Sequence, residues 1–246
     1  MDFNKWAHRA LALGLAMSLP ILVLWAPQID LPISALFFDL SVERFPARGQ
    51  PFPETAHAAI RIGGQLFATL LALGLVATVV SKKTIAGINA KAFAFLLCCM
   101  VAGPVLVTNT LLKDHWGRAR PVQVVEFKGT REFTPPLLVA HQCEKNCSFV
   151  AGDPSVGFML HCLAYLAAPG RRRRILFWSG MAAGSAAGAL RIWMGAHFFS
   201  DVVFAAAFML VTAAALHAVF FGWRITLEWW RDWLYLGYAG TKRASC

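Results

Sequence analysis

The sequence predicts an all-α protein, a six-transmembrane helix bundle with periplasmic loops that carry the candidate site. Apolar residues make up 58% of the 246 residues and charged residues only 15%, whereas soluble domains carry about 25% charged residues. The mean hydropathy is +0.56. The apolar residues gather in stretches as long as a bilayer requires, which is about 20 residues per helix. This composition excludes an intrinsically disordered chain, a collagen and a disulfide-dense secreted protein.

One membrane domain is expected over residues 1–246. Six stretches qualify as spans, at about 8–26, 58–80, 92–112, 149–168, 175–193 and 198–221. Lys5 and Arg9 precede the first one, as in a secretory signal, but its apolar run is long and no clear small-x-small cleavage site is present, so a retained anchor helix is favoured. Segment 27–57 holds five prolines and is not expected to form a long helix. Its part 31–40 could lie in the membrane interface.

The basic residues that flank the spans fall on one side of the membrane if six helices cross it. They are Lys5, Arg9, Lys82, Lys83, Lys91, Arg171, Arg172, Arg173, Arg174, Arg224, Arg231, Lys242 and Arg243. The positive-inside rule makes this side the cytoplasm. Both termini then lie in the cytoplasm of a bacterial inner membrane, and segments 27–57, 113–148 and 194–197 face the periplasm. The net charge of +10 therefore reflects topology and contact with anionic lipid rather than a nucleic-acid partner.

Span 175–193 carries Gly180, Gly184 and Gly188 at every fourth position. Small residues at this spacing allow two helices to approach closely within a bilayer. Tight packing inside one chain is the favoured interpretation, and a homodimer through this face is the alternative.

The six cysteines fall into separate groups. Those within apolar spans (Cys98, Cys99, Cys162) are expected to be small core residues. Cys143 and Cys147 share the long outer loop, where the compartment is oxidising, and a disulfide between them is favoured. A zinc site would need further ligands and His141 is the only near one, so no metal site is expected.

The first polar cluster closes span 92–112. Lys113 and Arg120 are seven residues apart, about two helical turns, so both could point the same way if the helix continues. Pro121 disfavours helical geometry at Arg120. Two cations with few carboxylates nearby indicate a bound anion, and a guanidinium and an ammonium suit phosphate oxygens.

The second cluster opens span 149–168. Gly152 lets a backbone N–H approach an anion closely, at a helix N-terminus whose unpaired N–H groups and dipole favour phosphate. Asp153 could donate a proton to a leaving oxygen when it is itself protonated. The alternative for Asp153 is a helix cap, where Asp is common.

The third cluster joins the last two spans. His197 and Asp201 lie four residues apart, on one face of a helix, and Arg191 precedes them. Asp201 could accept a hydrogen bond from one ring nitrogen and leave the other nitrogen free to attack, as in catalytic triads. The alternative is a histidine buried in the core.

Together the clusters predict phosphoryl transfer at the periplasmic face. Lys113, Arg120 and Arg191 would stabilise charge on the phosphoryl oxygens. His197 would attack in line to form a phosphohistidine, which water would hydrolyse. No metal or other cofactor is needed, because the cations take that electrostatic role. Four further loop cations could contact a second anionic group or simply be solvated: Arg118, Lys128, Arg131 and Lys145.

Three parts of the sequence resemble the signature of the type 2 phosphatidic acid phosphatase superfamily. They are Lys113-x6-Arg120-Pro121, the turn Ser148–Asp153 and Arg191-x5-His197-x3-Asp201. The resemblance covers about residues 90–221. It implies an integral-membrane lipid phosphatase with a periplasmic site, in which the three cations hold phosphate, His197 is the nucleophile and Asp201 orients it.

The second part departs from the usual pattern of this superfamily. It commonly reads Pro-Ser-Gly-His, and the four positions here are Val150, Ala151, Gly152 and Asp153. The segment is more similar to a bacterial inner-membrane branch, lipid A phosphatase-like, that reads Asn-Cys-Ser-Phe-Val-Ser-Gly followed by an acidic residue. Ala151 then lacks one hydroxyl donor to phosphate, which could slow the reaction by roughly one to three orders of magnitude. In the third part, Leu190 replaces the Ser that usually precedes the arginine.

The expected function is removal of phosphate from a membrane lipid, such as lipid A, phosphatidylglycerol phosphate or undecaprenyl pyrophosphate. A phosphotransferase that passes the phosphoryl group to another lipid would use the same residues. An inactive lipid-phosphate-binding homologue is the third interpretation, and it is based on the departures at positions 150, 151 and 153.

Overall fold

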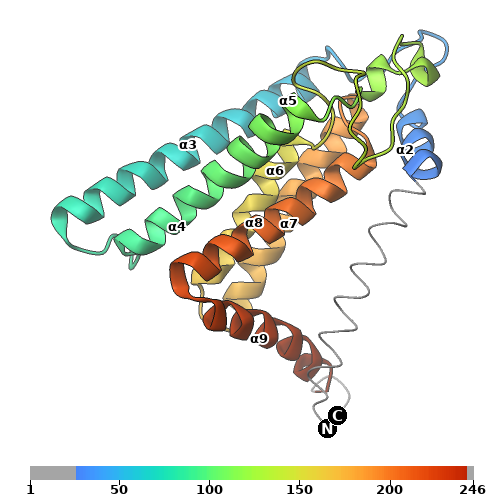
Figure 1. Ribbon diagram of the computed structural model, residues 1–246. Coiled ribbons are helices and arrows are strands. Elements are labelled where there is room, and N and C mark those ends of the chain that lie inside the picture. Colours follow the sequence, from blue (N-terminus) through green and yellow to red (C-terminus); the bar gives the residue numbers. More distant parts are fainter. Residues whose placement is uncertain (1–25, 243–246) are drawn as a thin grey trace.

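The computed structural model describes residues 26–242, and these residues are helical apart from connecting loops and isolated bridges. The elements in chain order are α2 (Ala26–Ala35), α3 (Pro51–Ser81), α4 (Ala90–Met100), η1 (Val101–Leu112), α5 (Lys113–His115), η2 (Pro121–Gln123), η3 (Val125–Phe127), α6 (Gly152–Met159), η4 (Leu160–Leu166), α7 (Arg171–Trp193), α8 (Phe199–Phe221) and α9 (Trp223–Lys242). Figure 1 shows the long helices side by side in one bundle. The predicted all-α class is confirmed for this part of the chain.

Four helices within residues 26–242 are long and apolar enough to cross a membrane: Pro51–Ser81, Ala90–His115, Arg171–Trp193 and Phe199–Phe221. They correspond to the predicted spans 58–80, 92–112, 175–193 and 198–221. The predicted span 8–26 lies outside the described residues except for its last position. The count of six spans therefore stays a prediction.

The predicted span 149–168 forms two short consecutive helices instead of one long one. The α-helix α6 has eight residues, and the tighter 3₁₀ helix η4 has seven and ends at an extended Ala167. None of residues 152–166 is exposed, because α6 packs against α3, η1, α7 and α8. The segment is thus the interior of the bundle, which explains why it reads as apolar without being a long helix.

The glycine face of α7 is occupied inside the chain. Gly184 lies against the ring of Phe158, and Gly188 lies against Val202 of α8. Gly180 lies against the backbone of η4, and all three glycines are buried. A Cβ atom at any of these positions would meet a neighbouring element of the same chain. The favoured interpretation, packing inside one chain, therefore describes these three glycines, and a homodimer stays a prediction.

The two ends of the bundle differ in character (Figure 1). One end carries α2, the long connection from α5 to α6, and the turn between α7 and α8. The opposite end carries the α3–α4 connection, the start of α7 and the amphipathic helix α9. Three segments that are distant in sequence thus meet at the first end.

Candidate active site

A cavity of about 410 Å³ opens at the end of the bundle that carries α2 and the long loop. Its lining brings together six of the seven residues expected to take part in catalysis or phosphate binding: Lys113, Arg120, Gly152, Asp153, Arg191 and His197. Asp201, the seventh, is fully buried next to His197. The three sequence clusters therefore converge in one place.

His197 lies in the turn between α7 and α8, where Gly195 reverses the chain with a left-handed φ of 61°. Its Nδ1 atom donates a 2.8 Å hydrogen bond to the backbone carbonyl of Ser148, so the lone pair of the neutral ring is on Nε2. Burial, together with the Arg120 and Lys113 cations, lowers the pKa of His197 to about 3 against the opposing effect of nearby Asp201. The ring is neutral at ordinary pH, which is the state in which Nε2 can attack an electrophile.

Asp201 is connected to His197 through Ser148 and has no direct hydrogen bond to it. Its Oδ2 atom is 3.8 Å from Nδ1 of His197, which is beyond hydrogen-bond distance. Oδ2 accepts instead from Oγ of Ser148 at 2.6 Å and from the backbone N–H of Phe198 at 2.9 Å. The i, i+4 spacing correctly predicted that the two residues are neighbours. The spacing did not predict that Asp201 bonds to Ser148 and Phe198 instead, because the carboxylate caps the start of α8.

Arg118 is fully buried. Both predictions for it, a solvated loop charge and a contact with a second anionic group, are therefore wrong. Its guanidinium donates to Oδ1 of Asp201 at 2.5 Å and to Oδ2 of Asp30 at 2.8 Å. Ser200 donates to Asp30 through its backbone N–H at 2.8 Å and its hydroxyl at 2.6 Å. This network ties α2 to the start of α8 and fixes Asp201. Burial raises the pKa of Asp30 although Arg118 opposes the shift.

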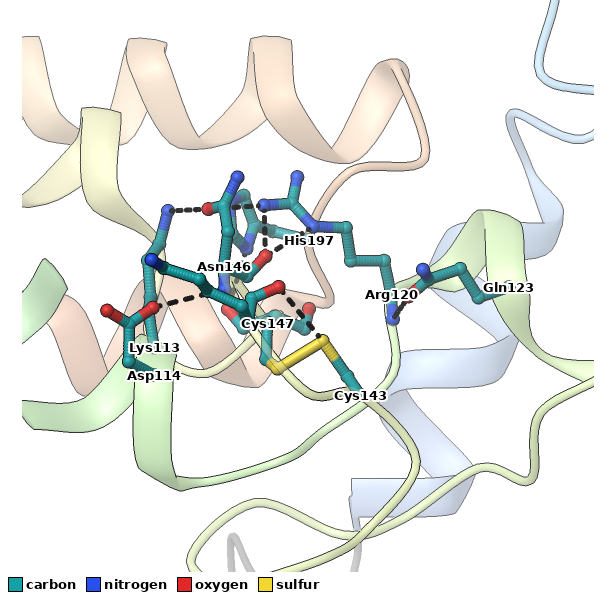
Figure 2. Close-up of a disulfide and its surroundings, with 10 residues drawn as sticks. Lys113, Asp114, Arg120, Gln123, Cys143, Asn146, Cys147 and His197 are labelled. Carbon is teal, nitrogen blue, oxygen red and sulfur yellow. Dashed lines mark hydrogen bonds between the residues drawn. A yellow bond between two sulfur atoms is a disulfide. The ribbon is translucent and has the colours of Figure 1, made fainter.

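Lys113 and Arg120 do not share a helix, because α5 ends at His115 and Arg120 has extended backbone (φ −85°, ψ 159°). They meet through Asn146, whose Oδ1 atom accepts from Arg120 Nη2 at 3.0 Å and from Lys113 Nζ at 3.4 Å (Figure 2). The backbone carbonyl of Asn146 also accepts a hydrogen bond from Arg120 Nη2 at 2.8 Å. Burial, followed by the charge of Arg191, lowers the pKa of Arg120 to about 10, so the side chain is still cationic at neutral pH.

A disulfide joins Cys143 and Cys147, the pairing that their shared loop favoured. Figure 2 shows it directly beside Asn146. The backbone N–H of Cys147 donates to the carbonyl of Lys113 at 3.0 Å, and the N–H of Asn146 donates to Asp114 at 3.2 Å. The disulfide loop is thereby held against α5, and it holds Asn146 between the two pocket cations. Asn146 matches the asparagine that begins the pattern of the bacterial branch, but its position between the two cations was not predicted.

Gly152 begins α6 and lies close to the ammonium group of Lys113. A Cβ atom at this position would be 2.9 Å from Nζ of Lys113 and 3.2 Å from Oδ1 of Asn109. A methyl group here would therefore push the Lys113 ammonium aside, so glycine allows the close approach of the helix start to the cation. The start of α6 lines the cavity with Gly152 and Asp153, and a helix N-terminus favours a bound anion.

Asp153 has two partners in the cavity, and the sequence did not predict that it contacts either of them. Its Oδ2 atom is 2.6 Å from Nδ1 of His57 and 3.3 Å from Nε of Arg191. His57 is on α3, where it lines the cavity together with Arg61. Neither residue was proposed from the sequence. The available signal was two ionisable residues at the outer end of an apolar span, which is where functional groups are expected in membrane proteins.

Part of the cavity lining is apolar. It is formed by Ala68 of α3, Met100 of α4, and Pro104 and Val105 of η1. Val105 is 49% exposed on the outer surface of the bundle. The polar end of the cavity is therefore continuous with an apolar surface that belongs to a candidate span.

A helical bundle with membrane spans, and a cavity that places a neutral imidazole among arginine and lysine side chains, define the class of membrane-bound phosphatases. Within residues 26–242, no three His, Cys, Asp or Glu side chains converge as metal ligands would.

Comparison with known proteins agrees with this class. The profile of the PAP2 superfamily matches residues 92–225. The lipid A 4'-phosphatase of Francisella tularensis subsp. novicida (strain U112) is 34% identical over 214 residues, which cover 87% of this chain and 96% of that protein. The lipid A 4'-phosphatase of Rhizobium etli is 40% identical over 123 residues, covering 50% of this chain and 48% of that protein. A third, from Rhizobium leguminosarum, is 37% identical over 131 residues, or 53% and 56% of the two chains.

No solved structure matches the chain. The profile match covers more than half of the sequence, and the Francisella relative aligns along almost its whole length. The chain belongs to the PAP2 superfamily and is a membrane-bound phosphatase.

Proposed function

We propose that the protein hydrolyses a phosphate monoester of a membrane lipid of the lipid A type. It would remove the phosphate group at the 4' position through a phosphohistidine intermediate. The observation that carries the proposal is the hydrogen bond from His197 Nδ1 to Ser148, which leaves Nε2 as the attacking atom in a cavity lined by Lys113, Arg120 and Arg191. The names of the relatives support the choice of lipid A over phosphatidylglycerol phosphate and undecaprenyl pyrophosphate.

In the proposed reaction, the three cations hold the phosphoryl oxygens and stabilise the charge that develops on them. Nε2 of His197 attacks phosphorus in line with the ester oxygen. The P–O bond breaks, and the lipid leaves as an alcohol after it takes a proton from an acid on the Asp153 side of the cavity. Water then attacks phosphorus, the P–N bond breaks and inorganic phosphate leaves.

A lipid substrate fits the mixed polar and apolar lining of the cavity. The cations and the start of α6 line it together with apolar residues such as Ala68 of α3 and Pro104 of η1. A headgroup phosphate could reach His197 while the acyl chains remain beside α3 and η1 in the bilayer. A soluble phosphate ester would gain no binding free energy from these apolar residues.

The periplasmic orientation of the site is part of the proposal. Lys82, Lys91 and the arginine run that starts at Arg171 lie at the end of the bundle opposite the cavity, as the positive-inside rule expects for a cytoplasmic end. In intact cells, a membrane-impermeant thiol reagent should label Leu138→Cys in the long loop and should not label Lys83→Cys. Labelling of Lys83→Cys alone would show that the protein has the opposite orientation in the membrane.

The function is tested with purified protein in vesicles that contain bisphosphorylated lipid A, phosphatidylglycerol phosphate or undecaprenyl pyrophosphate. Wild-type protein should release inorganic phosphate from lipid A, and mass spectrometry should show loss of the 4'-phosphate. His197→Ala should lower this rate by at least about a thousandfold, whereas His141→Ala, in an exposed loop position, should not. Equal release by wild type and His197→Ala from all three lipids would contradict the proposal. Transfer of labelled phosphate to another lipid without free phosphate would show a phosphotransferase.

A further inference from the structure

A second histidine shares the cavity with His197. His57 of α3 lines the same 410 Å³ space, and its side chain is 24% exposed. Its Nδ1 atom is 2.6 Å from Oδ2 of Asp153, a residue 96 positions further along the chain. A histidine held by a carboxylate through one nitrogen presents the other nitrogen to the cavity. His57 therefore has the arrangement of a proton-transfer residue.

The same contacts argue against Asp153 as the acid itself. Its Oδ2 atom faces the guanidinium of Arg191 at 3.3 Å as well as the ring of His57. An ionised carboxylate is the form that pairs with a guanidinium and accepts from an imidazole N–H. Asp153 is 15% exposed in its side chain, so water replaces little of this pairing. A carboxylate in this position holds and orients its neighbours rather than supplying a proton.

We propose that His57 is the general acid and base of the reaction and that Asp153 is its positioning residue. The inference rests on the proposed phosphohistidine reaction. In the first half, Nε2 of His57 gives its proton to the leaving oxygen as the P–O bond breaks, and imidazolium becomes imidazole. In the second half, the same nitrogen takes a proton from the water that attacks phosphorus, and the imidazolium is restored. Protons balance over the cycle.

The geometry divides the two histidines by role. His197 is almost fully buried and is held by a backbone carbonyl, which leaves its Nε2 unprotonated as a nucleophile requires. His57 is partly exposed and is held by a carboxylate through Nδ1, which leaves Nε2 as the nitrogen that can exchange a proton in the cavity. The two rings come from different parts of the chain, and both line one cavity.

The test compares two substrates with matched tails in mixed micelles: dodecyl phosphate, whose alkoxide needs a proton to leave, and 4-dodecyl-2-nitrophenyl phosphate, whose phenoxide leaves without one. His57→Ala should lower the rate on dodecyl phosphate by about 10²- to 10³-fold and the rate on the nitrophenyl ester by less than about tenfold. Added imidazole should restore part of the dodecyl phosphate rate in His57→Ala. The ratio of the two rates within one preparation does not depend on how much of the variant folds.

Other variants separate the possible failures. Asp153→Asn should show the same selective loss as His57→Ala but should not respond to imidazole. His141→Ala should leave both rates unchanged, because this residue is exposed in the loop. An equal loss on both esters in His57→Ala, with no response to imidazole, would overturn the role of His57. If His197→Ala kept the wild-type rate on both esters, the phosphohistidine reaction itself would fail instead.

Discussion

Ser148 lies between His197 and Asp201: its carbonyl accepts from Nδ1 of His197 at 2.8 Å, and its hydroxyl donates to Asp201 at 2.6 Å. One residue in the loop before α6 thus links the proposed nucleophile to the buried carboxylate. Asp201 has a further bond to Arg118, which is itself paired with Asp30. The orientation of the imidazole therefore depends on a chain of contacts from α2 to α8.

The link through Ser148 predicts different effects for substitutions of Ser148 and of Asp201. Ser148→Ala keeps the carbonyl and loses only the hydroxyl bond to Asp201, so kcat on lipid A should fall by about tenfold with little change in KM. Asp201→Asn removes the charge that pairs with Arg118 and should lower kcat by more than about 100-fold. Steady-state kinetics in micelles measure both. A wild-type kcat in Asp201→Asn would show that Asp201 does not position His197.

The buried imidazole of His197 predicts a pH-dependent stability. The pKa of His197 is lowered from 6.5 to about 3 in the folded protein, so below pH 6.5 the unfolded chain binds a proton that the folded chain does not. The stabilisation is complete above pH 6.5 and is lost progressively as the pH falls towards 3. Thermal midpoints in detergent should therefore fall less between pH 7 and pH 4 in His197→Asn than in the wild type. Parallel curves would contradict the lowered pKa.

The close approach of Gly152 to Lys113 predicts that an added methyl group impairs the site. In Gly152→Ala, the Cβ atom would displace the Lys113 ammonium, and kcat/KM should fall by about 10- to 100-fold. Gly63→Ala is the matched control, because this helical glycine has open space at its Cβ position. Thermal midpoints should stay close to the wild type in both variants. An unchanged kcat/KM in Gly152→Ala would show that Lys113 adjusts without cost.

The buried position of Arg118 predicts a loss of stability rather than of substrate affinity. Arg118→Met leaves Asp30 and Asp201 without their cation and should destabilise the fold by about 3–5 kcal/mol. Arg131→Met, which changes an exposed loop cation, should cost less than about 0.5 kcal/mol. Denaturation in mixed micelles compares the two. If Arg118→Met is as stable as Arg131→Met, the network does not hold α2 and α8 together.

The disulfide predicts an effect on phosphate binding, because it holds Asn146 between Lys113 and Arg120. Replacing Cys143 and Cys147 together by Ser should raise KM by about threefold to tenfold, with a smaller change in kcat. Treating the wild type with dithiothreitol should have the same effect. The double variant should not respond to dithiothreitol, and a response there would place the effect at another cysteine.

Local patterns determined much of the candidate site. The residues His197, Arg191, Lys113 and Arg120 were identifiable because charged groups stand out where apolar spans end. The apolar stretch 149–168 was predicted to be a span, and residues 152–166 within it form the consecutive helices α6 and η4 inside the bundle. Length and hydropathy do not distinguish a helix that faces lipid from one surrounded by other helices.

By itself, the sequence determined that the protein is a helical membrane protein with a cationic site around His197, because apolar length, charge position and short spacings are local properties. Only the tertiary structure decided the partners. His57 meets Asp153 across 96 positions and Arg118 meets Asp30 across 88. Hydrophobic periodicity indicates which face of a helix is buried, but a buried ionisable group is satisfied by whichever distant side chain the packing of helices brings within reach.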